Sequence, residues 1–193
     1  MPQVVKLAKY PPFSLPSRLK VLVVIPIKNE ANFLHQLFLN INNFIHHQIN
    51  VKYLLIDGLS DDATLFIASS MSKESSKDVS VLSNKHETVP WALNLAILNH
   101  PNTDVFIRLD AHANYPPDYL VNCVDLLNKS GAHNVGGCIQ TLPANNTLIA
   151  LAIANAISSP FGVGGSKFRH LRQASQAPEA VDTVPFGAFR FDI

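Results

Sequence analysis

Two side chains that can bind a metal ion stand close together near the middle of the sequence. Asp110 ends the apolar run VFIRLD, and His112 follows after one intervening residue. On extended backbone, residues i and i+2 point to the same side, so a carboxylate and an imidazole would meet there. Such a pair can hold a divalent cation, and the cation can hold a diphosphate. The pattern predicts a site for Mg²⁺ or, because of the imidazole, Mn²⁺.

Polar residues also follow two other apolar runs. Asn29 and Glu30 come directly after VLVVIPIK, and Asp57 ends VKYLLID. Ligands of open parallel sheets bind at the carboxyl ends of the strands, so we expect these residues to share an edge with the metal pair. Pro26 and Glu30 are predicted to contact a nucleobase. The Asp57 carboxylate is predicted to accept hydrogen bonds from a base imide or a ribose hydroxyl.

Each of these residues also has a structural interpretation. Asp57 can cap its own turn, Glu30 can occupy the first turn of a helix, and His112 can simply be exposed. Asn94 lies in the helical segment WALNLAI, where asparagine has low propensity. We expect the Asn94 side chain either to contact a sugar or phosphate or to face solvent. Arg108 is expected to hold a carboxylate rather than to touch substrate, because a buried guanidinium needs a partner.

Predicted strands and helices alternate along the chain, and these elements would position the residues named above. One of the helices is expected to begin near Ser60, and the Ser60 side chain is predicted to cap it. The alternation implies an α/β fold with a mostly parallel, doubly wound sheet. Strands are expected in the run 20–30, whose last residues are polar, and at 51–57, 78–83, 104–110, 133–141 and the C-terminal end. Helices are expected at 31–47, from Ser60 onward, and at 91–99, 116–129 and 145–158.

Length and composition restrict the class of protein. The 193 residues suit a proline-punctuated lead-in over 1–19 and one domain over 20–193. A net charge of +1 gives no general attraction to nucleic acid. Charged residues make up 15%, which is low, so further chain, a partner or a membrane is expected to cover part of the surface. The most apolar stretch, 148–157, is too short to span a membrane and predicts a buried helix.

The segments VLVVIPIKNEANFL, LLIDGLSDDAT, WALNLAI and IRLDAHANYPPDYL together resemble the successive motifs of family 2 glycosyltransferases. DAHA stands where that family has its DxD motif, and the chain looks most like the succinoglycan-type exopolysaccharide transferases. The resemblance covers about residues 20–190. It implies a GT-A fold, a UDP-sugar donor and Mn²⁺ or Mg²⁺. It also implies that Asp57 contacts the nucleoside and that Asp110 and His112 serve the metal and the diphosphate.

The resemblance further implies transfer of a hexose to a polysaccharide or lipid-linked glycan acceptor by metal-assisted inverting displacement. A location at the cytoplasmic face of the membrane is expected with it. In such enzymes a carboxylate from an acidic motif after the segment VPFGAFR deprotonates the acceptor. Glu179, Asp182 and Asp192 lie in no such motif. We therefore expect a C-terminally truncated chain, with the base and a membrane-associating segment beyond Ile193.

Two other interpretations follow from the same residues. The chain can be an inactive fragment or pseudoenzyme that only binds nucleotide sugar. It can also be a nucleotidyltransferase, but that class needs a glycine-rich, basic phosphate loop after the first strand. The segment IPIKNEAN offers Lys28 and no glycine, which disfavours this second alternative.

Overall fold

The structure, a computed structural model, describes residues 18–159, 162, 178–181 and 183–191. The chain forms two compact units. One consists of Tyr10–Val135 with Phe186–Ile193, and the other of Met1–Lys9 with Gly136–Pro185. Most of the expected lead-in over residues 1–19 lies outside the described residues.

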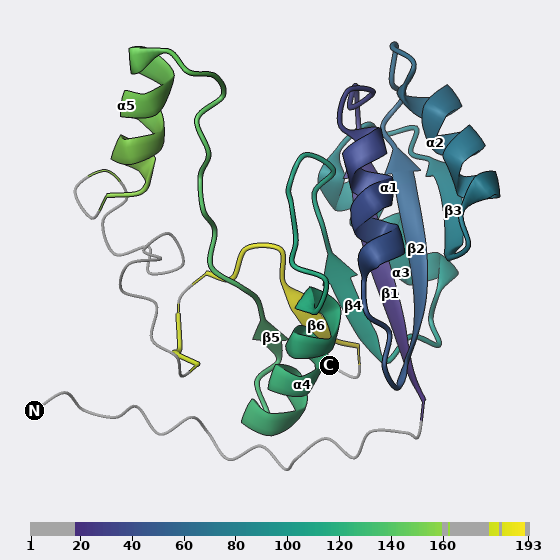
Figure 1. The fold of residues 1–193 in the computed structure, drawn as a ribbon. Helices are drawn as coiled ribbons and strands as arrows, with labels where there is room; N and C mark the ends of the chain where they lie inside the picture. Colours follow the sequence, from purple (N-terminus) through teal and green to yellow (C-terminus); the bar gives the residue numbers. More distant parts are fainter. Residues whose placement is uncertain (1–17, 160–161, 163–177, 182, 192–193) are drawn as a thin grey trace, which may run out of the picture. The chain divides into compact units, whose positions relative to one another are not determined.

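The unit built from Tyr10–Val135 and Phe186–Ile193 contains a six-stranded sheet (Figure 1). The strand order is β3-β2-β1-β4-β6-β5. The first four are parallel, whereas β6 runs antiparallel to both β4 and β5. The strands are β1 (Leu19–Ile27), β2 (Ile49–Asp57), β3 (Asp78–Ser83), β4 (Val105–Arg108), β5 (Asn134–Val135) and β6 (Ala188–Arg190). The predicted mostly parallel α/β sheet is confirmed.

Helices cover both faces of this sheet, as Figure 1 shows for α1 and α2 on one face and α3 on the other. The helices are α1 (Leu34–Asn43), α2 (Thr64–Glu74), α3 (Val89–Asn99) and α4 (Tyr119–Ser130). Alternate residues of β1 enter two separate cores. Val23 and Ile25 pack with α1, α2 and α4, while Leu22 and Val24 pack with α3. A strand buried on both faces needs an uninterrupted apolar run, which explains the sequence KVLVVIPI.

Several sequence predictions about elements are wrong in detail. The helix at 148–157 was expected to be buried, but its Leu148 and Ile149 are 85% and 74% exposed. Ser60 does not cap α2, because the N-cap is Ala63 and no side chain caps that position. The strand expected over 133–141 is limited to two residues before Gly136 and Gly137, which weaken a strand. The strand expected to reach Asp110 ends at Arg108, and Ala111 and His112 form a turn.

The other unit has one regular helix among its described residues, α5 (Leu148–Ile157). Thr147 caps it, since the hydroxyl oxygen accepts a hydrogen bond from the Ala150 amide at 3.3 Å. Within the part of the chain that the structure describes, no helix is long and apolar enough to cross a membrane.

Candidate functional site

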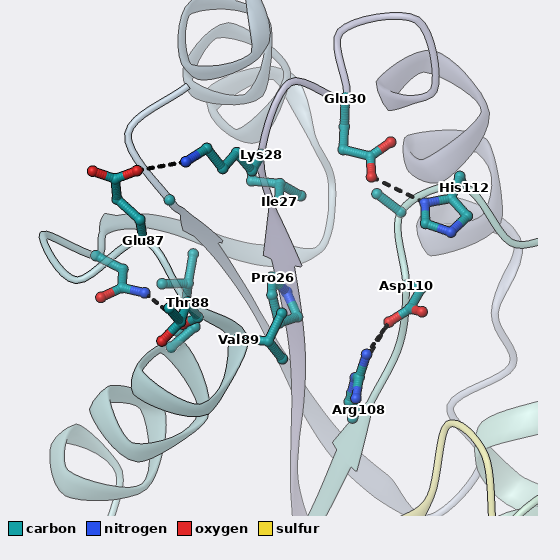
Figure 2. Close-up of a pocket in the computed structure, with 15 residues that line it drawn as sticks. Pro26, Ile27, Lys28, Glu30, Glu87, Thr88, Val89, Arg108, Asp110 and His112 are labelled. Atoms are coloured by element: carbon teal, nitrogen blue, oxygen red, sulfur yellow. Dashed lines mark hydrogen bonds and ion pairs between the residues drawn. The ribbon is translucent and has the colours of Figure 1, made fainter. Parts of the chain in front are cut away.

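A pocket of about 190 Å³ opens at the carboxyl edge of the parallel strands. Pockets for whole drug-sized ligands measure roughly 300–1,000 Å³, so this one suits part of such a ligand. Figure 2 shows the side chains that surround it. The lining residues are Pro26, Ile27, Lys28, Glu30, Ile56, Gly58, Asn84, Glu87, Thr88, Val89, Ala92, Arg108, Asp110, Ala111 and His112.

The register of the sheet explains why these segments converge. Ile27, the last residue of β1, pairs with Asp57, the last residue of β2, and Asp57 pairs with Ser83. On the other side of β1, Val24 pairs with Arg108, which ends β4. Parallel strands in this register finish at one edge, so the residues that follow each strand meet there.

Asp110 is held on two sides. Arg108 donates hydrogen bonds to its Oδ1 from Nη2 at 3.0 Å and from Nε at 3.3 Å. The backbone amide of Asp110 donates to the Tyr115 hydroxyl at 2.9 Å. Burial raises the pKa of Tyr115 well above its ordinary value, so the phenol stays protonated. Within the described residues Oδ2 makes no hydrogen bond or ion pair, which leaves one carboxylate oxygen for a ligand.

His112 lies on the same wall of the pocket but outside regular strand. Its Nδ1 is 3.0 Å from Oε1 of Glu30, and its ring meets Phe33 edge-on with centroids 5.9 Å apart. The side chain is 55% exposed, whereas that of Glu30 is 17% exposed. Asp110 and His112 therefore line one pocket, and they do so through a turn rather than through the predicted alternation of a strand.

Asp57 is placed differently from the prediction. Its carboxylate accepts hydrogen bonds from the Ser60 hydroxyl at 2.5 Å and the Ser60 amide at 3.2 Å. The residue is 1% exposed and is not among the pocket-lining residues. These contacts are those of a turn-capping aspartate. The neighbouring Gly58 reaches the pocket instead.

Asn29 also supports this turn and does not line the pocket. Its side-chain oxygen accepts from the Asp61 amide at 3.0 Å, and its own amide donates to Ser60 Oγ at 3.0 Å. Asn29 has a left-handed φ of 56°, a conformation that asparagine tolerates better than most residues. Asn94, predicted to contact ligand, lies on the exposed side of α3 and is not a lining residue either.

The segment 84–88 forms a wall of the pocket that sequence reasoning missed. Buried Asn84 organises it, since its Nδ2 donates to the Thr88 carbonyl at 2.8 Å and its Oδ1 accepts from the His86 amide at 3.1 Å. Lys28 and Glu87 form an ion pair at 2.5 Å beside Pro26, opposite the Arg108–Asp110 pair in Figure 2. A polar loop such as SNKHET carries no periodicity, so its position depends on the tertiary fold.

The donor atoms fit a divalent cation that also takes oxygens from a ligand. Among the described residues, no group of three or more His, Cys, Asp or Glu side chains is placed to hold a metal. Mg²⁺ and Mn²⁺ sites on phosphate substrates typically use one or two protein ligands, with phosphate oxygens and water completing the shell. Asp110 and His112 supply that number.

A second pocket, of about 260 Å³, lies at the opposite edge of the sheet. Lys20, Lys52, Asp78 and His100 contribute to its lining. Burial, followed by the charge of Lys52, lowers the pKa of His100. This pocket is larger, but it lies at the amino ends of the strands, away from the edge where α/β sheets bind ligands. The carboxyl-edge pocket is therefore the candidate site.

The sequence matches the family model "Glycosyl transferase family 2" over residues 22–193. It is 33% identical over 149 residues to the succinoglycan biosynthesis protein ExoA of Rhizobium meliloti (strain 1021), covering 77% of this chain and 44% of that protein. A glucuronosyltransferase of Methanococcus voltae that acts on a dolichyl phosphate-linked sugar is 27% identical, with coverage of 88% and 52%. The chain spans about half the length of these curated relatives.

Solved structures with the same fold include the mannosyltransferase PcManGT from Pyrobaculum calidifontis in complex with GDP-Man and Mn²⁺. The comparison of this chain with PcManGT gives a TM-score of 0.56 at 22% identity, and it covers 78% of this chain and 44% of PcManGT. S. aureus TarS 1-349 gives a TM-score of 0.61 at 16% identity, with coverage of 90% and 47%. These likenesses show the fold, which is the expected GT-A type. The family match favours a glycosyltransferase over a nucleotidyltransferase, and the chain belongs to glycosyl transferase family 2.

Proposed function

We propose that this chain forms the donor-binding part of a glycosyltransferase. The intact protein would move a hexose from a nucleotide sugar, with UDP-sugar as the proposed donor, to a polysaccharide or lipid-linked glycan. The single observation that supports this best is that Asp110 and His112 line the same carboxyl-edge pocket as the ends of β1 and β2. Solved structures with the same fold include complexes with UDP-GlcNAc and with GDP-Man, which agrees with a nucleotide-sugar donor.

In this proposal Asp110 and His112 hold Mn²⁺ or Mg²⁺ together with the donor diphosphate. When bound, the cation supplies charge neutralisation for the departing nucleoside diphosphate. The residues around it act by positioning. Arg108 keeps the Asp110 carboxylate oriented, and Tyr115 holds the Asp110 backbone.

The nucleoside would lie against Pro26, Gly58 and the wall made by residues 84–88. Gly58 lets Glu87 approach closely, since a Cβ there would stand 3.0 Å from the Glu87 carbonyl oxygen. Asn29 and Asp57 contribute through the turn that carries Gly58. We propose no direct contact from Asn94, because its side chain is exposed away from the pocket lining.

Inverting displacement needs a base that removes the acceptor hydroxyl proton. Glu179 is the one carboxylate among the described residues after position 135, and it belongs to the unit that contains α5 rather than to the unit with the pocket. Asp182 and Asp192 lie outside the described residues. The proposal therefore assigns the base, the acceptor site and membrane association at the cytoplasmic face to no residue of the described chain.

Isothermal titration calorimetry with UDP tests the proposal. We expect binding in Mn²⁺ that weakens by more than about tenfold in EDTA or in the near-isosteric variant Asp110→Asn. Asp125→Ala, which removes an exposed carboxylate paired with Lys129, is the matched control and should bind like the parent chain. Equal UDP affinity with and without EDTA would contradict the proposal. Metal-dependent binding without donor hydrolysis would favour the binding-module alternative over an active transferase.

A further inference from the structure

The carboxylate of Glu30 meets the imidazole of His112 from a different part of the chain. The two residues are 82 positions apart, and His112 Nδ1 lies 3.0 Å from Glu30 Oε1. An ionised carboxylate only accepts hydrogen bonds, so Nδ1 carries the proton in this contact. In a neutral imidazole the other nitrogen, Nε2, then has its lone pair available. Figure 2 shows Glu30 at one ring nitrogen, with the other nitrogen turned away from it.

Glu30 is itself firmly placed. Its backbone amide donates to Thr64 Oγ1 at 2.7 Å, and its carbonyl accepts from the Phe33 amide at 2.8 Å. These bonds attach the end of β1 to the start of α2 and to the turn before α1. The Glu30 side chain is 17% exposed, so it loses little further conformational entropy when it holds His112.

Phe33 contacts the His112 ring from a second direction and restricts its rotation. Its ring meets the His112 ring at an interplanar angle of 63°, in an edge-to-face arrangement. His112 sits in a turn and is 55% exposed, so its backbone and burial alone would not fix the imidazole. The orientation of this side chain depends on Glu30 and Phe33.

We propose that Glu30 is a positioning residue that keeps His112 protonated at Nδ1, so that Nε2 is the nitrogen offered to the metal. This rests on the proposed function, because it assigns a role within the same metal–diphosphate site. This positioning role replaces the nucleobase contact that the sequence predicted for the Glu30 carboxylate. A ligating histidine whose second nitrogen donates to a carboxylate has a fixed tautomer and a more basic metal-facing nitrogen.

The experiment combines a tautomer measurement with a metal-affinity measurement. Long-range ¹H–¹⁵N spectra of the histidine-labelled chain report which ring nitrogen is protonated, and His112→Ala identifies the signals. Mn²⁺ affinity in saturating UDP is measured by electron paramagnetic resonance. The variants are Glu30→Ala, Glu30→Gln and the control Asp125→Ala, which removes an exposed carboxylate that pairs with Lys129 and does not line the pocket.

The parent chain is expected to show His112 protonated at Nδ1. Glu30→Ala should lose that preference and bind Mn²⁺ about 10–100-fold more weakly. Glu30→Gln should recover part of both, because its amide oxygen still accepts a hydrogen bond, and Asp125→Ala should leave the His112 signals and the Mn²⁺ affinity unchanged. The backbone bonds of Glu30 do not involve its carboxylate, so these variants should fold, as their amide spectra would verify.

Three results would overturn the positioning role. The first is an unchanged tautomer and Mn²⁺ affinity in Glu30→Ala while Asp110→Asn still loses the metal, which leaves the proposed function intact. The second is loss of Mn²⁺ with an unchanged tautomer in both Glu30 variants, which makes Glu30 a direct ligand. The third is metal-independent UDP binding, or full Mn²⁺ affinity in Asp110→Asn, which removes the proposed function together with this inference.

Discussion

Arg108 and Asp110 form an ion pair across one intervening residue, with Nη2 of the arginine 3.0 Å from Oδ1 of the aspartate. The pair lies where β4 ends, so the arginine holds the carboxylate that the turn 110–113 presents to the pocket. The side chain of Asp110 is 21% exposed and keeps its second oxygen for a ligand. Replacing the Arg108 guanidinium would remove the group that orients the Asp110 carboxylate, while the carboxylate itself would stay available to a metal.

Arg108→Met should therefore weaken Mn²⁺-dependent UDP binding by about tenfold, the lower end of what loss of a ligand-orienting partner costs. Calorimetry at fixed Mn²⁺ measures it. Lys129→Met is the matched control, since Lys129 pairs with Asp125 on the exposed side of α4. An increase in affinity would show that the arginine competes with the metal for Asp110, contrary to the account.

Asp57 and Ser60 should behave as one structural unit. Asp57→Ala leaves two donors of Ser60 without their acceptor, and we expect a loss of about 1–3 kcal/mol in the free energy of unfolding. Ser60→Ala should be destabilising too, and the double variant should cost less than the sum of the single variants. Urea denaturation measures all three. Lost UDP binding with unchanged stability in Asp57→Ala would instead support a direct nucleoside contact.

The sequence predicted the sheet well where patterns are local. Continuous apolar runs marked β1 and β2, and strand β3 matches its predicted range of 78–83. The antiparallel pair β5 and β6 was less predictable, because a three-residue strand carries little periodicity and its pairing is set by tertiary contacts.

The candidate site was predictable in position but not in detail. Acidic strand ends located the edge of the sheet, and Arg108 holds a carboxylate as expected. Whether a polar residue meets a ligand or its own turn depends on side-chain geometry, which is why Asp57 and Asn29 are found in the turn network. The contact between Glu30 and His112 joins residues 82 positions apart, and no local pattern encodes it.

Gly58 should be intolerant of any side chain. An added Cβ would stand 3.0 Å from the Glu87 carbonyl oxygen, a backbone atom that moves only with the wall made by residues 84–88. Gly58→Ala is expected to lower the free energy of unfolding by about 1–3 kcal/mol, as overpacking does, and to weaken UDP binding. Urea denaturation and calorimetry measure the two effects. Parent-like values for both would contradict the close approach.

His46 should make stability depend on pH. Its Nε2 lies 2.7 Å from the hydroxyl of buried Tyr53. Burial, followed by the charge of Lys77, lowers the pKa of His46 below its ordinary value of 6.5. The unfolded chain therefore binds the proton more readily, and the free energy of unfolding should fall as pH drops below about 6.5.

His46→Gln should reduce this pH dependence, measured by urea denaturation at several pH values between about 8 and 5. Some dependence should remain, because the pKa of His100 is lowered as well. The exposed His35→Gln is the control and should follow the parent chain. Equal pH dependence in His46→Gln and the parent would show that the His46 contact does not carry the effect.

Amide NMR mapping with UDP and Mg²⁺ tests the central claim most directly, because it reports which edge of the sheet takes the nucleotide. The account predicts shifts at Gly58, Glu87 and Ala111, which line the carboxyl-edge pocket, and their loss when EDTA is added. Shifts centred on Lys52 and His100, at the opposite edge, or shifts at either edge that persist in EDTA, would contradict it.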